Sequence, residues 1–201
     1  MTIKDAKRNF IVDEATGLFL ERSIPEVTIK DIARRSGLGE ATVYRYFSGR
    51  SELIVACALK LQDRVGEKFL FFKENESGFE RLCSFYRAFS DTFEKDPELY
   101  RFLGEFDAYC VNEKADLDEY ADNMDLFKAA FLRAYREGVR DRSVRRVEDP
   151  ELFYYSTTHA VLSLCKKLAI EGDILRQDAL TDKAAEVKTL VGVILASLSA
   201  N

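Results

Sequence analysis

Apolar residues recur at intervals of three and four along nearly all of this 201-residue chain, and strict alternation of apolar with polar residues is almost absent. The first pattern places an apolar stripe along an α-helix, whereas the second is typical of a half-buried β-strand. With 47% apolar and 32% charged residues, the composition is that of a soluble globular protein. The sequence therefore predicts an all-α fold.

Capping residues divide this pattern into about nine helices. Ser77 and Glu80 have the spacing of a capping box, and an aspartate precedes a proline at 96–97 and at 149–150. Two short helices are expected from residue 28 onward, followed by the start of a long helix. The longer helices are predicted at about 3–22, 50–73, 77–95, 97–112, 117–138, 150–171 and 182–199, with breaks at Gly138 and Gly172.

The formal net charge of −5 hides an asymmetry between the two ends of the chain. Residues 1–60 hold ten Lys and Arg against eight Asp and Glu, a surplus of +2, which leaves twenty against twenty-seven, or −7, for 61–201. A polyanion is therefore expected to bind at the N-terminal part of the chain.

Several functional classes lack their usual residues. The four cysteines form no C-x-x-C pair and there is one histidine, so we expect no metal, no cofactor and no disulfide framework. The chain has no Glu-x-x-His pair and no glycine-rich phosphate loop, which argues against an enzyme. No apolar run approaches the roughly 18 residues of a membrane span, and the N-terminus has no signal-peptide core. We therefore expect a cytoplasmic protein without a membrane partner.

Residues 28–53 have the spacing of a helix-turn-helix. Thr28 and Asp31 resemble a capping box, and Ala33 is small enough to let a second helix approach. Gly37 tolerates the positive φ that the chain reversal requires, and Val43 is the apolar residue with which the second helix packs on the first. This spacing alone is also compatible with an ordinary helical hairpin.

The segment GLGEATVYRYFSGRSEL resembles the N-terminal DNA-binding domain of the TetR family of bacterial transcription regulators. The resemblance covers about residues 8–55, with lysine replaced by Arg50 and with Gly39 and Glu40 where polar or basic residues are usual. It implies a helix-turn-helix DNA-binding domain at 1–49 and a helical effector-binding and dimerisation domain at 50–201. The residues that match as they stand are Thr28, Ile32, Ala33, Gly37, Thr42, Val43, Tyr44, Tyr46, Phe47, Glu52 and Leu53.

A recognition helix of about eight residues presents only its first two turns to a DNA major groove. Tyrosine hydroxyls and arginines suit phosphate oxygens. Base edges are within reach of Glu40, Ala41, Thr42 and Arg45. The alternatives are that Tyr46 and Phe47 belong to the core, and that Glu40 is only a favourable charge in a first helical turn. The predicted DNA-binding residues are Thr28, Arg34, Arg35, Glu40, Ala41, Thr42, Tyr44, Arg45, Tyr46 and Arg50.

The last predicted helix is apolar nearly all round, which is typical of a helix that is buried on two sides. One side can serve its own domain and the other a partner, although a helix threading a monomer has the same pattern. The resemblance implies that the last two helices pair with their symmetry mates in a homodimer, which a palindromic DNA site requires. The predicted interface residues are Phe153, Val161, Leu164, Leu168, Val187, Val191, Ile194 and Leu198.

The middle of the chain is rich in aromatic residues, whose helical spacing is typical of core packing. The resemblance implies that part of this set lines a pocket for an unknown small-molecule effector. Ten acidic residues in 96–125 would suit a cationic ligand, but a solvated face is the better explanation, because most of these acids fall outside the apolar stripe. The predicted ligand-binding residues are Phe89, Phe102, Phe106, Tyr109, Phe127, Phe131 and His159.

The sequence therefore predicts a ligand-responsive transcriptional regulator. It would be a repressor that a small molecule releases from a palindromic double-stranded operator. The alternative is a helix-turn-helix protein without an effector, acting through protein–protein contacts. The effector and the operator sequence are not encoded in any recognisable motif.

Overall fold

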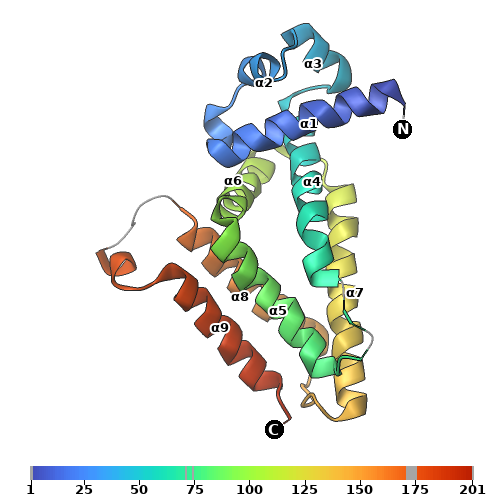
Figure 1. Ribbon diagram of the computed structural model, residues 1–201, viewed down its shortest axis with the longest axis vertical. Coiled ribbons are helices and arrows are strands. Elements are labelled where there is room, and N and C mark those ends of the chain that lie inside the picture. The colour runs from blue at the N-terminus through green and yellow to red at the C-terminus, as the bar shows by residue number, and fades with distance from the viewer. Residues whose placement is uncertain (1, 71, 74, 171–175, 201) are drawn as a thin grey trace. The chain divides into compact units, whose positions relative to one another are not determined.

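The computed structural model describes residues 2–70, 72–73, 75–170 and 176–200 (Figure 1). Over this part of the chain, the predicted all-α fold with nine α-helices is confirmed, and no β-strand is present apart from a lone bridge between Val144 and Ser199. The helices are α1 (Ile3–Glu21), α2 (Ile29–Arg35), α3 (Glu40–Tyr46), α4 (Arg50–Leu70), α5 (Gly78–Lys95), α6 (Pro97–Glu113), α7 (Asp118–Asp141), α8 (Pro150–Leu168) and α9 (Lys183–Leu198), with 3-10 turns η1 (Ile24–Glu26) and η2 (Arg176–Leu180).

The predicted caps at residues 28, 77 and 149 are present. The Thr28 and Ser77 hydroxyls accept from the backbone N–H three residues later, and each completes a capping box with the acidic side chain there. Asp149 accepts from the N–H groups of Glu151 and Leu152, both at 3.0 Å, directly before Pro150. These bonds satisfy backbone donors that the first helical turn leaves unpaired.

Three predicted helix ends were wrong. Helix α7 continues through Gly138 to Asp141, because this glycine does not terminate the helix but provides space. A Cβ on Gly138 would collide with the side chain of Val144, and Gly78 at the start of α5 packs on the Gly138 backbone. Helix α4 ends at Leu70, before the predicted Lys73. Helix α8 ends at Leu168, before the predicted residue 171. The predicted break at Gly172 lies outside the described residues.

The chain forms two compact units, and the first comprises residues 1–64 and 101–121. It contains α1, α2 and α3, most of α4 and the larger part of α6. Phe19 and Phe102 lie with their ring centroids 6.1 Å apart and are fully buried. Phe102 in turn stacks on Phe106. The core of this unit also includes Ile11, Ala15, Ile24, Ile32, Val43, Phe47, Leu53 and Ile54.

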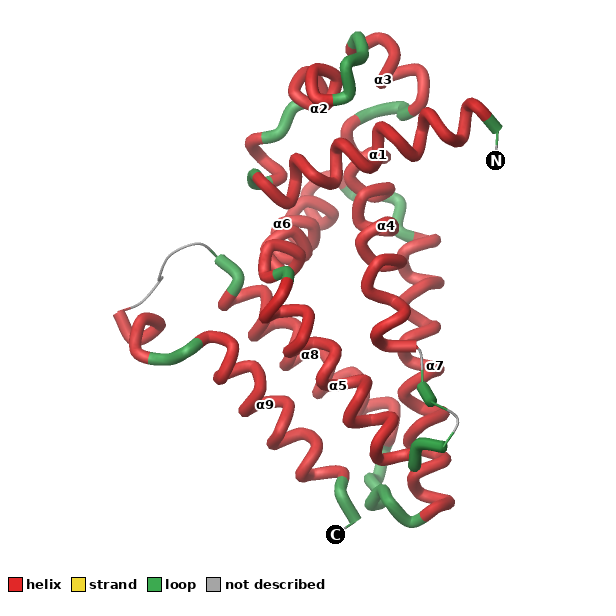
Figure 2. Tube along the Cα trace, in the orientation of Figure 1, coloured by secondary structure: helices red, strands yellow, loops and turns green. Residues whose placement is uncertain are grey.

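The second unit comprises residues 65–100 and 122–201, and α5 packs against α8 and α9 within it. Figure 2 shows α5 and α9 as neighbouring straight helices. Its core is largely aromatic and includes Phe69, Phe85, Tyr86, Phe89, Phe131 and Tyr154. Edge-to-face contacts dominate among them, such as Phe69 on Phe89 at 4.7 Å, which is a favourable geometry for aromatic pairs.

Candidate nucleic-acid interface

Helices α2 and α3 form the predicted helix-turn-helix. Gly37 has φ of +65°, a conformation that side-chain-bearing residues rarely adopt, and it reverses the chain after α2. The N–H of Leu38 donates to the Ala33 carbonyl at 2.9 Å and closes the turn. Ala33 and Val43 are buried between the two helices, as the sequence predicted. The turn thus fixes the angle at which α3 leaves α2.

Helix α3 is seven residues long and buries one residue fully, Val43. Glu40, Ala41, Tyr44 and Arg45 are exposed, and Tyr44 keeps 53% of its surface in contact with solvent. Thr42 and Tyr46 are half-buried, and the Arg45 guanidinium lies 5.5 Å from the Tyr46 ring centroid. Buried Phe47 ends the helix. The outer face of α3 therefore offers a hydroxyl, a guanidinium and a carboxylate within two turns.

The two arginines of α2 have different surroundings. Arg35 lies against α1, where Nε donates to Glu14 at 3.2 Å and Nη1 to Glu21 at 2.5 Å. The bond from Arg35 lowers the pKa of Glu21 below its ordinary value. Gly17 of α1 makes room for this guanidinium, since a Cβ there would lie 3.1 Å from Arg35 Nη2. Arg34 is exposed, with Asp31 at 3.7 Å. Arg35 positions α2, whereas Arg34 remains available to a ligand.

Arg50 lies at the start of α4, but its guanidinium is directed into its own unit. Its Nε donates to the Val27 carbonyl at 3.1 Å, Nη2 donates to the Ile24 carbonyl, and the group lies 5.4 Å from the Tyr109 ring centroid. In the described structure these contacts hold the segment between α1 and α2, and the predicted phosphate contact at Arg50 stays a prediction. Nothing in the local sequence around Arg50 indicated these partners.

Helix α6 holds the same connecting segment from another side. Glu105 accepts from the N–H of Ile24 at 2.5 Å, and Arg101 donates to the Leu20 carbonyl at 2.6 Å. Sequence reasoning missed both residues. Their spacing of four on one helix was a weak signal, because such charged pairs are common on solvated faces. Together with Arg50 they satisfy backbone groups where α1 ends and the helix-turn-helix begins.

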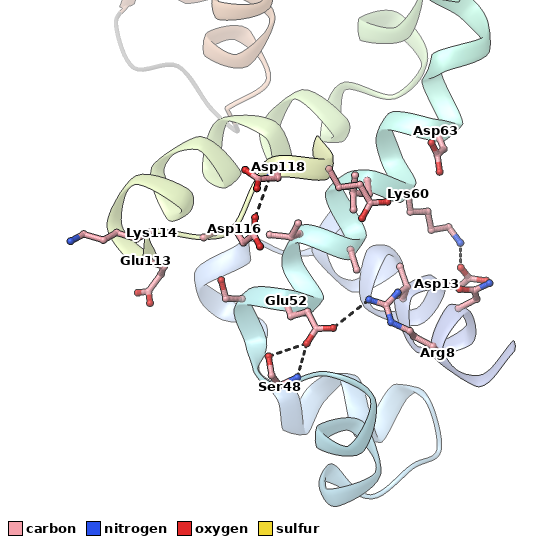
Figure 3. A pocket seen from close by; sticks show the side chains of 18 residues that line it. Arg8, Asp13, Ser48, Glu52, Lys60, Asp63, Glu113, Lys114, Asp116 and Asp118 are labelled. Atoms are coloured by element: carbon pink, nitrogen blue, oxygen red, sulfur yellow. Dashed lines mark hydrogen bonds and ion pairs between the residues drawn. The ribbon is translucent and has the colours of Figure 1, made fainter. Parts of the chain in front are cut away.

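A groove of about 1120 Å³ lies in the same unit between α1, α4 and the residues joining α6 to α7 (Figure 3). Glu52 of α4 accepts from the N–H and hydroxyl of Ser48, and Arg8 of α1 reaches it at 3.4 Å. Burial raises the pKa of Glu52, but the bonds from Ser48 and Arg8 outweigh it, so the pKa lies below its usual range. Lys60 pairs with Asp13 further along the groove. These contacts tie α1 to the N-terminus of α4.

The predicted ligand-binding residues are divided between the two units. Phe102 and Phe106 are core residues of the first unit, where Tyr109 also lies beneath Arg50. In the second unit, Phe131 is fully buried against neighbouring rings, and His159 is exposed beside Tyr155 at 5.9 Å. Phe89 and Phe127 both pack on Phe69. Their predicted role in ligand binding stays a prediction.

The predicted dimer residues are mostly buried inside the protomer. Val187, Val191, Ile194 and Leu198 are each at most 6% exposed, and Val161 and Leu168 are equally inaccessible. Only Phe153 and Leu164 are half-buried. A partner contacting α8 and α9 would meet the opposite sides of these helices. Their exposed residues there include Leu152, Tyr155, His159 and Ser163 on α8 and Ala185, Thr189, Gly192, Val193 and Ala196 on α9.

Other kinds of site have little support in the described residues. Among them no group of three or more His, Cys, Asp or Glu side chains could hold a metal ion, and none of their helices has the length and apolarity to cross a membrane. All four cysteines are reduced and buried, and burial raises the pKa of Cys57 to about 12. That thiol is therefore protonated at neutral pH and unreactive.

Known proteins match the N-terminal part in sequence and most of the chain in fold. Residues 11–57 match the profile of a family described as "Bacterial regulatory proteins, tetR family". The HTH-type transcriptional regulator AlkX of Mycobacterium tuberculosis (strain ATCC 25618 / H37Rv) is 30% identical over 86 residues, which are 43% of this chain and 38% of AlkX. The chain spans less than half of the length of the curated relatives it matches.

Two solved structures illustrate the likeness in fold. A TetR transcription regulator from Haloarcula marismortui ATCC 43049 has a TM-score of 0.73 at 16% identity, covering 96% of each chain. RolR, solved in complex with the ligand resorcinol, has a TM-score of 0.64 at 16% identity, covering 97% of this chain and 88% of RolR. At such identities the likeness concerns the fold.

Proposed function

The chain belongs to the TetR family of bacterial transcription regulators, and on that premise we propose that it is a homodimeric, ligand-responsive DNA-binding repressor that acts in the cytoplasm. The observation that carries this proposal is the exposed outer face of α3, held by the Gly37 turn and by Arg35 on α1. A short helix with free polar side chains at its outer face suits a major groove.

The exposed and half-buried residues of α2 and α3 suggest a division of roles on DNA. Thr42 and Arg45 would read base edges, with Ala41 and Glu40 beside them, because arginine binds guanine and the threonine methyl can contact thymine. Tyr44 and Arg34 would bind phosphate oxygens and set the register. Arg35 and Arg50 are left out of this set, since intramolecular partners already occupy their guanidinium groups.

The proposed dimer uses the exposed sides of α8 and α9. Val193 and Leu152 are each 62% exposed, and Gly192 has no neighbouring atom that a side chain would meet, so a second helix could approach closely. A twofold dimer presents two α3 helices to successive major grooves of a pseudo-palindrome. A small molecule bound between helices of the C-terminal part would fix the α3 helices at another spacing and release the operator.

DNA selection tests this proposal. Purified protein should select pseudo-palindromic fragments from the genome of its source. If each protomer neutralises roughly three or four phosphates, log affinity should fall against log salt with a slope of about −5 to −7. Failure to select any sequence, or a slope near zero, would contradict DNA binding.

A second candidate function keeps DNA binding without a small-molecule effector. The aromatic packing of the second unit favours it, because the rings pack on one another and fill the space between them. A metabolite library screened for release of the selected operator separates the two. Release by one compound supports the effector. Release by no compound, combined with co-purification of a protein partner that alters operator binding, supports the alternative.

A further inference from the structure

Helix α7, drawn as a long helix in Figure 2, carries charged residues on the side opposite its buried residues. Its inner side is formed by buried residues, namely Phe127, Ala130, Phe131, Ala134, Tyr135 and Gly138. At 100° per residue, a second set falls on the opposite side of the helix and is exposed throughout. Between residues 122 and 136 this set, the α7 stripe, consists of Asp122, Asp125, Ala129, Arg133 and Arg136.

The order of residues in the α7 stripe is symmetric about its middle. Asp122 and Arg136 lie seven residues before and after Ala129, and Asp125 and Arg133 lie four residues before and after it. The negative half therefore becomes the positive half when the helix is turned end to end about Ala129. Both halves belong to the second unit.

Effects within one chain do not account for this order. The helix dipole acts within the first and last turns, and Arg133 lies eight residues before the end of α7. Asp122 with Asp125, and Arg133 with Arg136, are like charges three residues apart, which is unfavourable in an isolated helix.

Existing partners leave much of the stripe free. Asp125 pairs with Lys128 at 3.0 Å, and Arg133 lies 5.9 Å from the Phe72 ring centroid. The side chains of Asp122 and Arg136 have no hydrogen bond or ion pair to any residue that the structure describes.

We propose that the α7 stripe binds the α7 stripe of a second copy of this chain, antiparallel and across a twofold axis at Ala129. Asp122 would then face Arg136 of the second copy and Asp125 its Arg133, and the twofold axis doubles these to four ion pairs. Alanine at the axis lets the two helices approach to the usual 8–10 Å or so. Leu126, which is 55% exposed beside the stripe, adds apolar surface to bury.

Charge complementarity favours a second copy of this chain over other partners of the α7 stripe. A nucleic acid or an anionic membrane would be attracted by the arginines and repelled by the aspartates, which lie about 10–20 Å away along the same face. A partner helix with the reversed order satisfies both halves, and the chain itself carries that order. The contact uses a helix outside the proposed α8–α9 dimer, so it would join two such dimers.

Sedimentation velocity of the full chain tests the pairing. Surface ion pairs are weak and screened by salt, so the contact should form at high protein concentration in about 0.02 M salt and disappear in about 0.5 M salt. The expected result is at least a doubling of the mass of the high-salt species. A mass that is independent of salt overturns the inference.

Charge reversal on the stripe identifies the surface. Asp122→Arg with Asp125→Arg makes the stripe entirely basic, and Arg133→Asp with Arg136→Asp makes it entirely acidic. Each variant alone should lose the low-salt association, and an equimolar mixture should regain it. Arg87→Asp with Lys95→Asp, on exposed residues of α5, lowers the net charge by as much as the acidic variant does and should behave as wild type.

Each other outcome contradicts the pairing. If the basic variant still associates alone while the acidic one does not, the arginines bind something other than this helix. If the mixture fails to associate although both variants show wild-type circular dichroism and melting, another surface is responsible. The high-salt species reports separately on the α8–α9 dimer: a monomer there contradicts the proposed dimer but leaves the α7 pairing standing.

Discussion

Val193→Glu distinguishes a partner-facing side of α9 from its core-facing side. Val193 is 62% exposed in the protomer, whereas Val191, two residues earlier, is 3% exposed. Full burial of a valine side chain is worth about 1.5–3 kcal/mol, so covering the exposed part of Val193 contributes about 1–2 kcal/mol in each protomer. Because a twofold dimer contains the contact twice, Val193→Glu removes about 4 kcal/mol of dimer stabilisation at most. The cost of burying a carboxylate adds to this loss.

The expected result is a dimer dissociation constant that rises by roughly 30- to 700-fold, since each 1.4 kcal/mol is tenfold. The fold should survive, because Val193 contacts little within the protomer. Val191→Glu should instead unfold the chain, because it places a charge in the core of the second unit. Val111→Glu is the matched control, since Val111 is 81% exposed on α6 and outside the proposed interface.

Sedimentation equilibrium gives the dissociation constants, and thermal melting followed by circular dichroism shows whether each variant folds. The reasoning fails if Val193→Glu dimerises with the wild-type constant. It also fails if Val191→Glu melts as wild type and loses only dimerisation, because Val191 would then face the partner.

Tyr44→Phe should weaken operator affinity by about 0.5–1.5 kcal/mol per protomer without changing base preference. Arg45→Ala should weaken operator affinity by about 1–3 kcal/mol and relax the preference at one base pair. Both are measured on single-base operator variants. Arg34→Ala should reduce the slope of log operator affinity against log salt by about one per protomer and leave the stability of the fold unchanged. Arg35→Ala should lower the free energy of unfolding by roughly 0.5–2 kcal/mol and leave that slope unchanged. If fluorescence titrations give the two results the other way round, Arg35 is the phosphate ligand and Arg34 the residue that holds α2. The pKa of Glu52 lies below its ordinary 4.5, so its stabilising contribution is present above pH 4.5 and is lost as the pH falls through the folded-state pKa. In Glu52→Gln, the free energy of unfolding from urea titrations should therefore fall less steeply as the pH is lowered. An unchanged pH dependence would show that the Ser48 and Arg8 contacts contribute nothing.

The parts of the fold that the sequence predicted are those with local causes. A capping box at Thr28 needs only Asp31 three residues later, and the turn at Gly37 needs only a residue that tolerates positive φ. Both were found where their residues stand. Gly138 shows the limit of this reasoning: a glycine can end a helix or admit another backbone, and Gly78, sixty residues away in the chain, decides which.

Long-range contacts decided the roles of the arginines. In the sequence Arg34, Arg35 and Arg50 are equivalent cations near a helix-turn-helix. Only the folded chain brings Glu14 and Glu21 to Arg35 and two carbonyl groups to Arg50. Through those bonds, two of the three candidate phosphate ligands hold α2 and its connection to α1.

The same limit governs α9. Its sequence is apolar on nearly every side, so periodicity cannot tell which side meets α5 and α8 and which remains for a partner. The side of α9 with the larger side chains, which includes Val191 and Ile194, is buried in the core of the protomer, because large side chains fill the space between packed helices. The side that remains exposed carries Ala185, Gly192 and Ala196, whose small size suits the close approach of a second helix. A sequence-based search for an interface should therefore favour, on an all-apolar terminal helix, the side with small residues over the side with large ones.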